Sequence, residues 1–223
     1  MKVDMWVRIL GGLWMRCLKT SPEKLAGTLI FVGTAQFILF ATVAEALYPD
    51  YSISNNYISD LGVGPSAPLF NSSVLVLGLS VVASVYLLRH VYGKHLVFLI
   101  FLFLCGIGAV GAGLFPANLS VIHQFFSMLA FLFGALSAVA SLKIQKSPFS
   151  YIAAVLGLFS LVAFAMFTFS EYLFYVHSVA HYFKLGKGGL ERMIAYPIFL
   201  WALGFGGHLA GKSVDNETLN NAP

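Results

Sequence analysis

Long apolar stretches, separated by short segments rich in proline and charged residues, recur six times along the chain. A helix needs about 20 apolar residues to cross the roughly 30 Å hydrocarbon layer of a bilayer, and the stretches reach or approach that length. They cover residues 25–47, 68–88, 95–115, 120–142, 149–170 and 191–210. The pattern predicts an all-α fold, a polytopic membrane bundle of six transmembrane helices. In the last stretch Gly207 and Gly211 form a GxxxG spacing, which favours close approach of a neighbouring helix.

Residues 5–19 differ from the six stretches because basic residues are interspersed among the apolar ones. The apolar positions recur at helical spacing: Trp6, Ile9, Leu10, Leu13, Trp14 and Cys17. The segment is too short and too charged to span, so we expect an amphipathic helix lying at the membrane interface. The chain is thus predicted to have three parts: an interfacial segment (1–22), a six-helix transmembrane domain (23–211) and a disordered cytoplasmic tail (212–223).

Basic residues indicate the orientation of the predicted bundle. The loop between the first two spans has no Lys or Arg and carries only Asp50 and Asp60 as charged residues. Lys and Arg lie instead before the first span, after the second and fourth spans and in the tail: Lys2, Arg8, Arg16, Lys19, Lys24, Arg89, Lys94, Lys143, Lys146 and Lys212. The positive-inside rule therefore predicts a multi-pass protein of the cell membrane with both termini cytoplasmic.

Composition excludes several classes of protein. Of 223 residues, 59% are hydrophobic and 10% are charged, with a mean hydropathy of +0.85, whereas soluble domains carry about 25% charged residues. A soluble enzyme, a disordered chain and a nucleic-acid binder are all inconsistent with these values. Cys17 and Cys105 are expected in different environments, so we expect neither a disulfide nor a thiolate metal site. No cleavable signal peptide is expected either, because the first long apolar run begins only near Leu25.

Polar residues gather on the predicted outward side, beginning with the loop after the first span. Glu45 lies in the last turn of that span, where an ionisable group is costly. Asn56, Ser59 and Asp60 follow in the stretch Ser-Asn-Asn-Tyr-Ile-Ser-Asp-Leu-Gly. These residues either form a turn-rich loop or line an outward-facing pocket.

Two further segments reach the same side. His123 lies near the start of the fourth span, where it is either a hydrogen-bonded structural residue or a group that faces the same vestibule. Gly186-Lys187-Gly188-Gly189 precedes Glu191 and Arg192, and a glycine-rich turn that leads into a helix N-terminus can bind phosphate. Lys187 and Arg192 are therefore candidate ligands of a lipid head group. Alternatively, Arg192 pairs with Glu191, Asp60 or Glu45 and holds the loops together.

His177 and His181 lie one helical turn apart between the last two spans. The pair could bind zinc if His123 and an acid completed the site. The alternative is an amphipathic interfacial helix whose polar face is hydrated. Haem is the less favoured cofactor, because the histidines do not lie at matched depth on opposed spans.

Three ordered motifs resemble a known family. They are Asn55-Asn56-Tyr57-Ile58-Ser59-Asp60-Leu61-Gly62, then Gly113-Leu-Phe-Pro116 with His123, then Gly188-Gly-Leu-Glu-Arg-Met-Ile-Ala-Tyr-Pro197 with Trp201. Together they resemble the membrane-protein family known as domain of unknown function 998. The Ile58-Ser59-Asp60 element is also distantly similar to six-span proteins related to autophagy modulators and a GPI-anchor remodelling factor. The first resemblance implies six spans in a prokaryotic cell membrane but no activity; the second makes lipid handling more plausible.

These features lead to one favoured hypothesis and several alternatives. The favoured one is a protein that binds or modifies a membrane lipid at an outward-facing polar pocket. Its head-group ligands would be Asn56, Ser59, Lys187 and Arg192, and its proton-transfer groups would be Asp60, His123 and Glu191. A zinc-dependent lipid hydrolase, a transporter and a non-catalytic structural or partner-binding subunit are the alternatives. Membrane lipids are the expected partners, with a homo-oligomer or larger membrane complex as a further expectation.

Overall fold

The computed structural model describes residues 21–169 and 185–212, and these ranges contain helices and 3₁₀ turns with no strand. Six helices are long and apolar enough to cross a membrane, which confirms the predicted fold class. They are α2 (Pro22–Leu47), α3 (Ala67–Tyr92), α4 (Leu96–Leu114), α5 (Ser120–Ala140), α6 (Phe149–Thr168) and α8 (Gly186–Ala210). The interfacial segment as far as residue 20, His177, His181 and the tail from residue 213 lie outside the described residues.

Local signals explain where the first and last helices begin. Ser21 caps α2 by accepting a hydrogen bond from the backbone N–H of Lys24 at 3.3 Å, and Pro22 occupies the first turn, as expected at a helix start. The sixth helix begins at Gly186, five residues before the predicted position. The glycine-rich segment is therefore the first turn of α8 rather than a separate turn.

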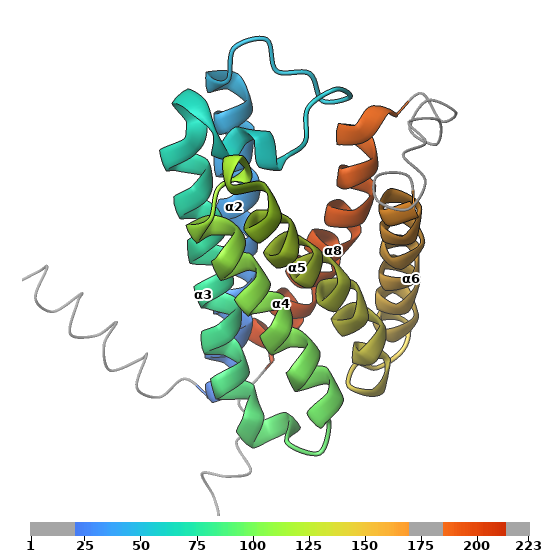
Figure 1. The fold of residues 1–223 in the computed structure, drawn as a ribbon. Coiled ribbons are helices and arrows are strands. Elements are labelled where there is room, and N and C mark those ends of the chain that lie inside the picture. Colours follow the sequence, from blue (N-terminus) through green and yellow to red (C-terminus); the bar gives the residue numbers. More distant parts are fainter. Residues whose placement is uncertain (1–20, 170–184, 213–223) are drawn as a thin grey trace, which may run out of the picture.

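The helices form a closed ring (Figure 1). Each helix packs against its neighbours in sequence, and α8 closes the ring by packing between α2 and α6 while also touching α5. The crossing of α2 and α8 is tight: a Cβ on Gly27 would lie 2.6 Å from the Gly206 oxygen, and one on Gly206 would lie 2.8 Å from the Gly27 oxygen. The close contact thus uses Gly206, whereas a Cβ on Gly207 would meet only ordinary contacts.

Large apolar side chains cover the outside of the ring. Leu39, Val155 and Leu200 are each more than half exposed, and many others on every helix are similarly placed. In water such a surface would be a large apolar patch; in a bilayer it faces lipid. The interior instead holds the buried clusters around Phe205 and Ile194 and around Phe37 and Leu61.

One end of the ring carries the segments in which the sequence gathers polar residues. Residues 48–66, which include the 3₁₀ turn Ser59–Gly62 (η1), lie at the same end as the start of α8 and the start of α5 (Figure 1). We call residues 48–62 the cap. At the opposite end the Glu23 carboxylate accepts hydrogen bonds from Lys212 and Tyr92, which joins the ends of α2, α3 and α8.

Candidate functional site

Arg192 connects α8 to the cap and to α2. Its side chain is 4% exposed, and its Nη2 donates to Glu45 Oε1 at 2.8 Å and to the Tyr51 hydroxyl at 2.7 Å. Its Nη1 donates to the carbonyl oxygens of Ile53 at 3.0 Å and Gly188 at 3.1 Å. Of the three ion-pair partners considered for Arg192, the structure therefore selects Glu45.

The Arg192 guanidinium has little capacity left for a ligand. Within the described ranges, its Nε is the buried side-chain nitrogen that has no hydrogen-bond partner. The predicted role of Arg192 as a head-group ligand rests on that single N–H.

Tyr51 completes this contact from the cap side. Its hydroxyl accepts from Arg192 and donates to the carbonyl oxygen of Tyr57 at 2.9 Å. Burial raises the pKa of the Tyr51 phenol to about 12, although the adjacent Arg192 acts in the opposite direction. The phenol is therefore protonated at neutral pH, as its donor role requires.

The glycines at the start of α8 allow the cap backbone to approach closely. A Cβ on Gly188 would lie 1.9 Å from the Asn56 oxygen, and the Gly188 N–H donates to the Ser54 oxygen at 3.0 Å. Gly186 has a φ of +69°, which glycine adopts without strain. The Lys187 Nζ lies 4.5 Å from the centre of the Tyr57 ring, a cation–π distance. The glycine-rich start of α8 and Lys187, which the sequence predicts to bind phosphate, thus contact the cap in the structure.

Asp60 and Asn56 stabilise the fold of the cap. The Asp60 Oδ2 accepts from the Tyr57 N–H at 2.9 Å and from the Asn56 side-chain amide at 3.3 Å. The Asn56 Oδ1 in turn accepts from the Ser52 N–H at 3.0 Å. This arrangement corresponds to the turn-rich alternative for the stretch.

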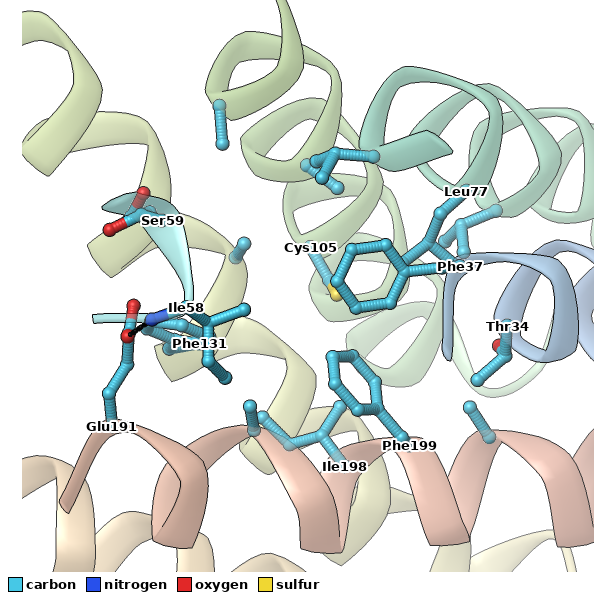
Figure 2. Close-up of a pocket in the computed structure, with 18 of the residues that line it drawn as sticks. Thr34, Phe37, Ile58, Ser59, Leu77, Cys105, Phe131, Glu191, Ile198 and Phe199 are labelled. Carbon is cyan, nitrogen blue, oxygen red and sulfur yellow. Dashed lines mark hydrogen bonds between the residues drawn. The ribbon is translucent and has the colours of Figure 1, made fainter. Parts of the chain in front are cut away.

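Glu191 contacts a different part of the cap from the part that Arg192 contacts. Its side chain is 4% exposed, and one carboxylate oxygen accepts a short hydrogen bond from the Ile58 N–H (Figure 2). In the same view Ser59 lies next to Glu191, at the opposite side of the space from Thr34. Two consecutive residues of α8 therefore bind the cap at different places. Arg192 hydrogen-bonds to residues 51–56, and Glu191 accepts a hydrogen bond from Ile58.

His123 is buried at the end of the first turn of α5, and both its ring nitrogens have partners. The Nδ1 lies 2.7 Å from the carbonyl oxygen of Phe115, and the Nε2 lies 3.1 Å from the Ser127 Oγ. A carbonyl oxygen only accepts, so Nδ1 carries the proton. In the neutral imidazole Nε2 is then the acceptor, and Ser127 donates to it.

An internal cavity of about 120 Å³ lies within the ring beneath the cap. Its wall is mainly apolar. Four polar side chains line its cap end: Ser59, His123, Ser127 and Glu191. Thr34, midway along α2, adds a hydroxyl on the opposite side (Figure 2). An apolar cavity of about 150 Å³ holds a benzene molecule, so this space admits a small group or a segment of a chain.

A second hollow lies between α2 and α8 on the outside of the ring. This groove, of about 250 Å³, includes Glu45, Thr42 and Tyr196 in its wall. It shares Phe37, Ile58 and Phe199 with the internal cavity. The Phe37 and Phe199 rings, 5.1 Å apart between centroids, therefore lie between the cavity and the lipid-facing groove.

The predicted site residues have two roles. Asn56, Asp60, Lys187 and Arg192 stabilise the cap, and Ser59 and His123 line the cavity. Glu191 does both. Sequence reasoning missed Ser127 and Tyr51. The spacing of His123 and Ser127, one helical turn apart, was a signal that could have identified Ser127.

No cluster of three metal-ligating side chains occurs in residues 21–169 and 185–212. His123 is engaged with Phe115 and Ser127, and Glu45 with Arg192. The zinc hypothesis thus depends on His177 and His181, outside the described residues.

A family model described as "Protein of unknown function (DUF998)" matches residues 31–208. Neither the curated proteins nor the solved structures include a match to the chain. Since the match covers more than half of the sequence, the chain belongs to the DUF998 family.

Proposed function

We propose that this DUF998 protein binds a membrane-dissolved amphiphile, with the polar end of the molecule in the cavity beneath the cap and its hydrocarbon chain directed through the groove toward lipid. The observation that carries the proposal is the pairing of an internal cavity, polar at its cap end, with a lipid-facing groove that shares three wall residues with it.

The polarity of the cavity supports an amphiphile over a purely apolar ligand. Glu191, Ser59 and His123 supply a carboxyl group, a hydroxyl group and an imidazole to a wall that is otherwise mainly apolar. Ligand sites commonly combine an apolar wall with a few polar groups that fix orientation. The polar end of the ligand would therefore contact these three residues, and Lys187 and Arg192 would act by holding the cap.

The groove favours a ligand that comes from the bilayer. Tyr196 and Leu200 in its wall are about half exposed or more, on a helix whose outer face is apolar. On the aqueous side the cap is held by the contacts of Arg192 and Glu191. Access through the groove requires the Phe37 and Phe199 rings to move, a side-chain motion, whereas access through the cap requires buried polar contacts to break.

The orientation of the bundle places the cap on the outer side in this proposal. Six spans put both ends of the helical domain on one side, and Arg89, Lys94, Lys143 and Lys146 lie at that side. By the positive-inside rule that side is cytoplasmic. The ligand would then come from the outer leaflet of the cell membrane.

Photo-crosslinking tests the proposal. The full chain is placed in phosphatidylglycerol nanodiscs with a monoacylglycerol that carries a diazirine on the first carbons of its acyl chain, next to the ester at its polar end, and crosslinked peptides are mapped by mass spectrometry. Ala109 lines the cavity, so Ala109→Phe should fill it and reduce crosslinks to the cavity wall at least tenfold. Ala83, exposed on α3, provides the matched control: Ala83→Phe should leave them unchanged.

Two results would overturn the proposal. One is a set of crosslinks confined to the outer faces of the helices. The other is equal crosslinking of the cavity wall in Ala109→Phe and the unsubstituted protein. Size-exclusion profiles of both variants identify any loss of folding.

A further inference from the structure

The contact between His123 and Ser127 differs from the contacts of other serines in these helices. Ser73, Ser84 and Ser137 each donate to the carbonyl oxygen three or four residues earlier, the usual way for a helical serine to satisfy its hydroxyl in an apolar setting. Ser127 is also four residues after His123, but its hydroxyl meets the imidazole Nε2 at 3.1 Å. The serine proton is therefore directed at a base.

The tautomer of His123 is the one that base catalysis requires. The Nδ1–H donates to the Phe115 carbonyl oxygen, with 2.7 Å between nitrogen and oxygen, so the Nε2 lone pair faces the Ser127 hydroxyl. Phe115 is itself fixed, because its ring stacks on Phe126 with centroids 5.5 Å apart and planes 8° from parallel. A hydroxyl, a base that accepts its proton and a group that orients the base are the parts of an activated nucleophile.

We propose that Ser127 is a nucleophile, and His123 its general base, in the hydrolysis of an acyl ester of a membrane-dissolved amphiphile. This inference rests on the proposed function, because it places the ester carbonyl at the polar end of the same cavity. Both His123 and Ser127 line that cavity. The Ser59 hydroxyl lines it as well and can donate a hydrogen bond to the carbonyl oxygen as negative charge develops there.

The chemistry consists of two acyl transfers. In the first, the Ser127 Oγ forms a bond to the ester carbonyl carbon while His123 Nε2 takes the hydroxyl proton. The bond from that carbon to the alcohol oxygen breaks, and the alcohol leaves with the proton from His123. In the second, His123 takes a proton from water, whose oxygen attacks the acyl-serine carbon. The serine oxygen leaves with that proton, which releases a carboxylic acid and restores Ser127.

An active-site-directed probe tests the inference. A long-chain alkyl fluorophosphonate reacts with activated serines by losing fluoride, and the full chain in nanodiscs should form one adduct that maps to Ser127. Ser127→Ala should abolish the adduct. His123→Gln should slow its formation about 100-fold or more, as expected on removal of a general base. Ser137→Ala is the matched control, because Ser137 lies on the same helix and donates to a backbone oxygen; it should be labelled like the unsubstituted protein.

The monoacylglycerol crosslink separates the two proposals. If the cavity crosslinks form but no fluorophosphonate adduct appears at Ser127, the catalytic inference is wrong and amphiphile binding stands. If neither forms, both are wrong. An adduct whose rate is the same in His123→Gln, with the thermal transition unchanged, would also overturn the role of His123 as the base.

Discussion

Replacing Arg192 with alanine is the most direct test of how the cap is held. The substitution removes the guanidinium from the Glu45 carboxylate, from the Tyr51 hydroxyl and from the Ile53 carbonyl oxygen. Removing one partner of a buried ion pair typically costs about 3–5 kcal/mol, because the other partner remains buried without compensation. The Glu45 side chain is 27% exposed, so solvent relieves part of this penalty and we expect about 3 kcal/mol.

Thermal unfolding converts that value into an observable. For a chain of this size, 1 kcal/mol shifts the transition by roughly 2–4 °C, so Arg192→Ala should lower Tm by about 6–12 °C. Cys105 is a convenient reporter because it lines the internal cavity and reacts with a thiol-specific dye when the bundle opens. The measurement is made in detergent in a Cys17→Ser background, so that Cys105 is the only thiol of the chain.

Arg89→Ala is the matched control for loss of an arginine. Arg89 is exposed and contacts the Tyr86 ring with its guanidinium carbon 3.9 Å from the centroid, and exposed charge contacts contribute about 0–1 kcal/mol. Its Tm should therefore change by less than about 4 °C. A Tm for Arg192→Ala within 2 °C of the unsubstituted protein would refute the reasoning. In that case Arg192 would be a better candidate for a head-group ligand than for a structural contact.

The remaining predictions concern the glycine contact and the orientation. Gly188→Ala should lower Tm, because the added Cβ would lie 1.9 Å from the backbone oxygen of Asn56. Gly204→Ala is the control: nothing lies within 4 Å of its Cβ, so Tm should stay unchanged or rise slightly through helix propensity. Equal Tm shifts in the two variants would contradict the close contact. In intact cells and a cysteine-free background, a cysteine at Ile53 should react with a membrane-impermeant maleimide and one at Gln145 should not; the opposite pattern would invert the orientation.

The spans are predictable because each depends on the apolar composition of about 20 residues and not on which neighbours the helix packs against. The predicted start of α8 is wrong because the glycine-rich sequence is typical of a turn. In the structure Gly188 lies within the helix, and its missing Cβ is required by the Asn56 oxygen of the cap, 132 residues away in sequence. The same limitation applies at Gly207, where the spacing suggested close packing and the contact instead uses Gly206. A spacing rule identifies a helix face only approximately, while the register of two helices depends on both partners.

The candidate site shows where sequence reasoning needs tertiary information. The sequence leaves three possible ion-pair partners for Arg192. Glu45 is one of them, but it lies 147 residues away in sequence, and no local pattern distinguishes it from the other two. That choice follows from the ring, in which α8 packs beside α2. His123 was found as an unusual polar residue, but Ser127 was not, because a single serine in an apolar span normally satisfies itself on its own helix.

Glu191 and Arg192 are adjacent in sequence, yet the structure gives them different surroundings. Successive helical residues point about 100° apart, so Arg192 reaches residues 51–56 and Glu45 while Glu191 reaches Ile58 and the cavity wall. One turn of α8 therefore fixes the cap and also sets the polarity of the cavity beneath it. A ligand that hydrogen-bonds to Glu191 would compete with the Ile58 N–H for the same carboxylate. Ligand binding would then be linked to the position of the cap, whereas Arg192, which faces away from the cavity, would keep the cap attached in both states.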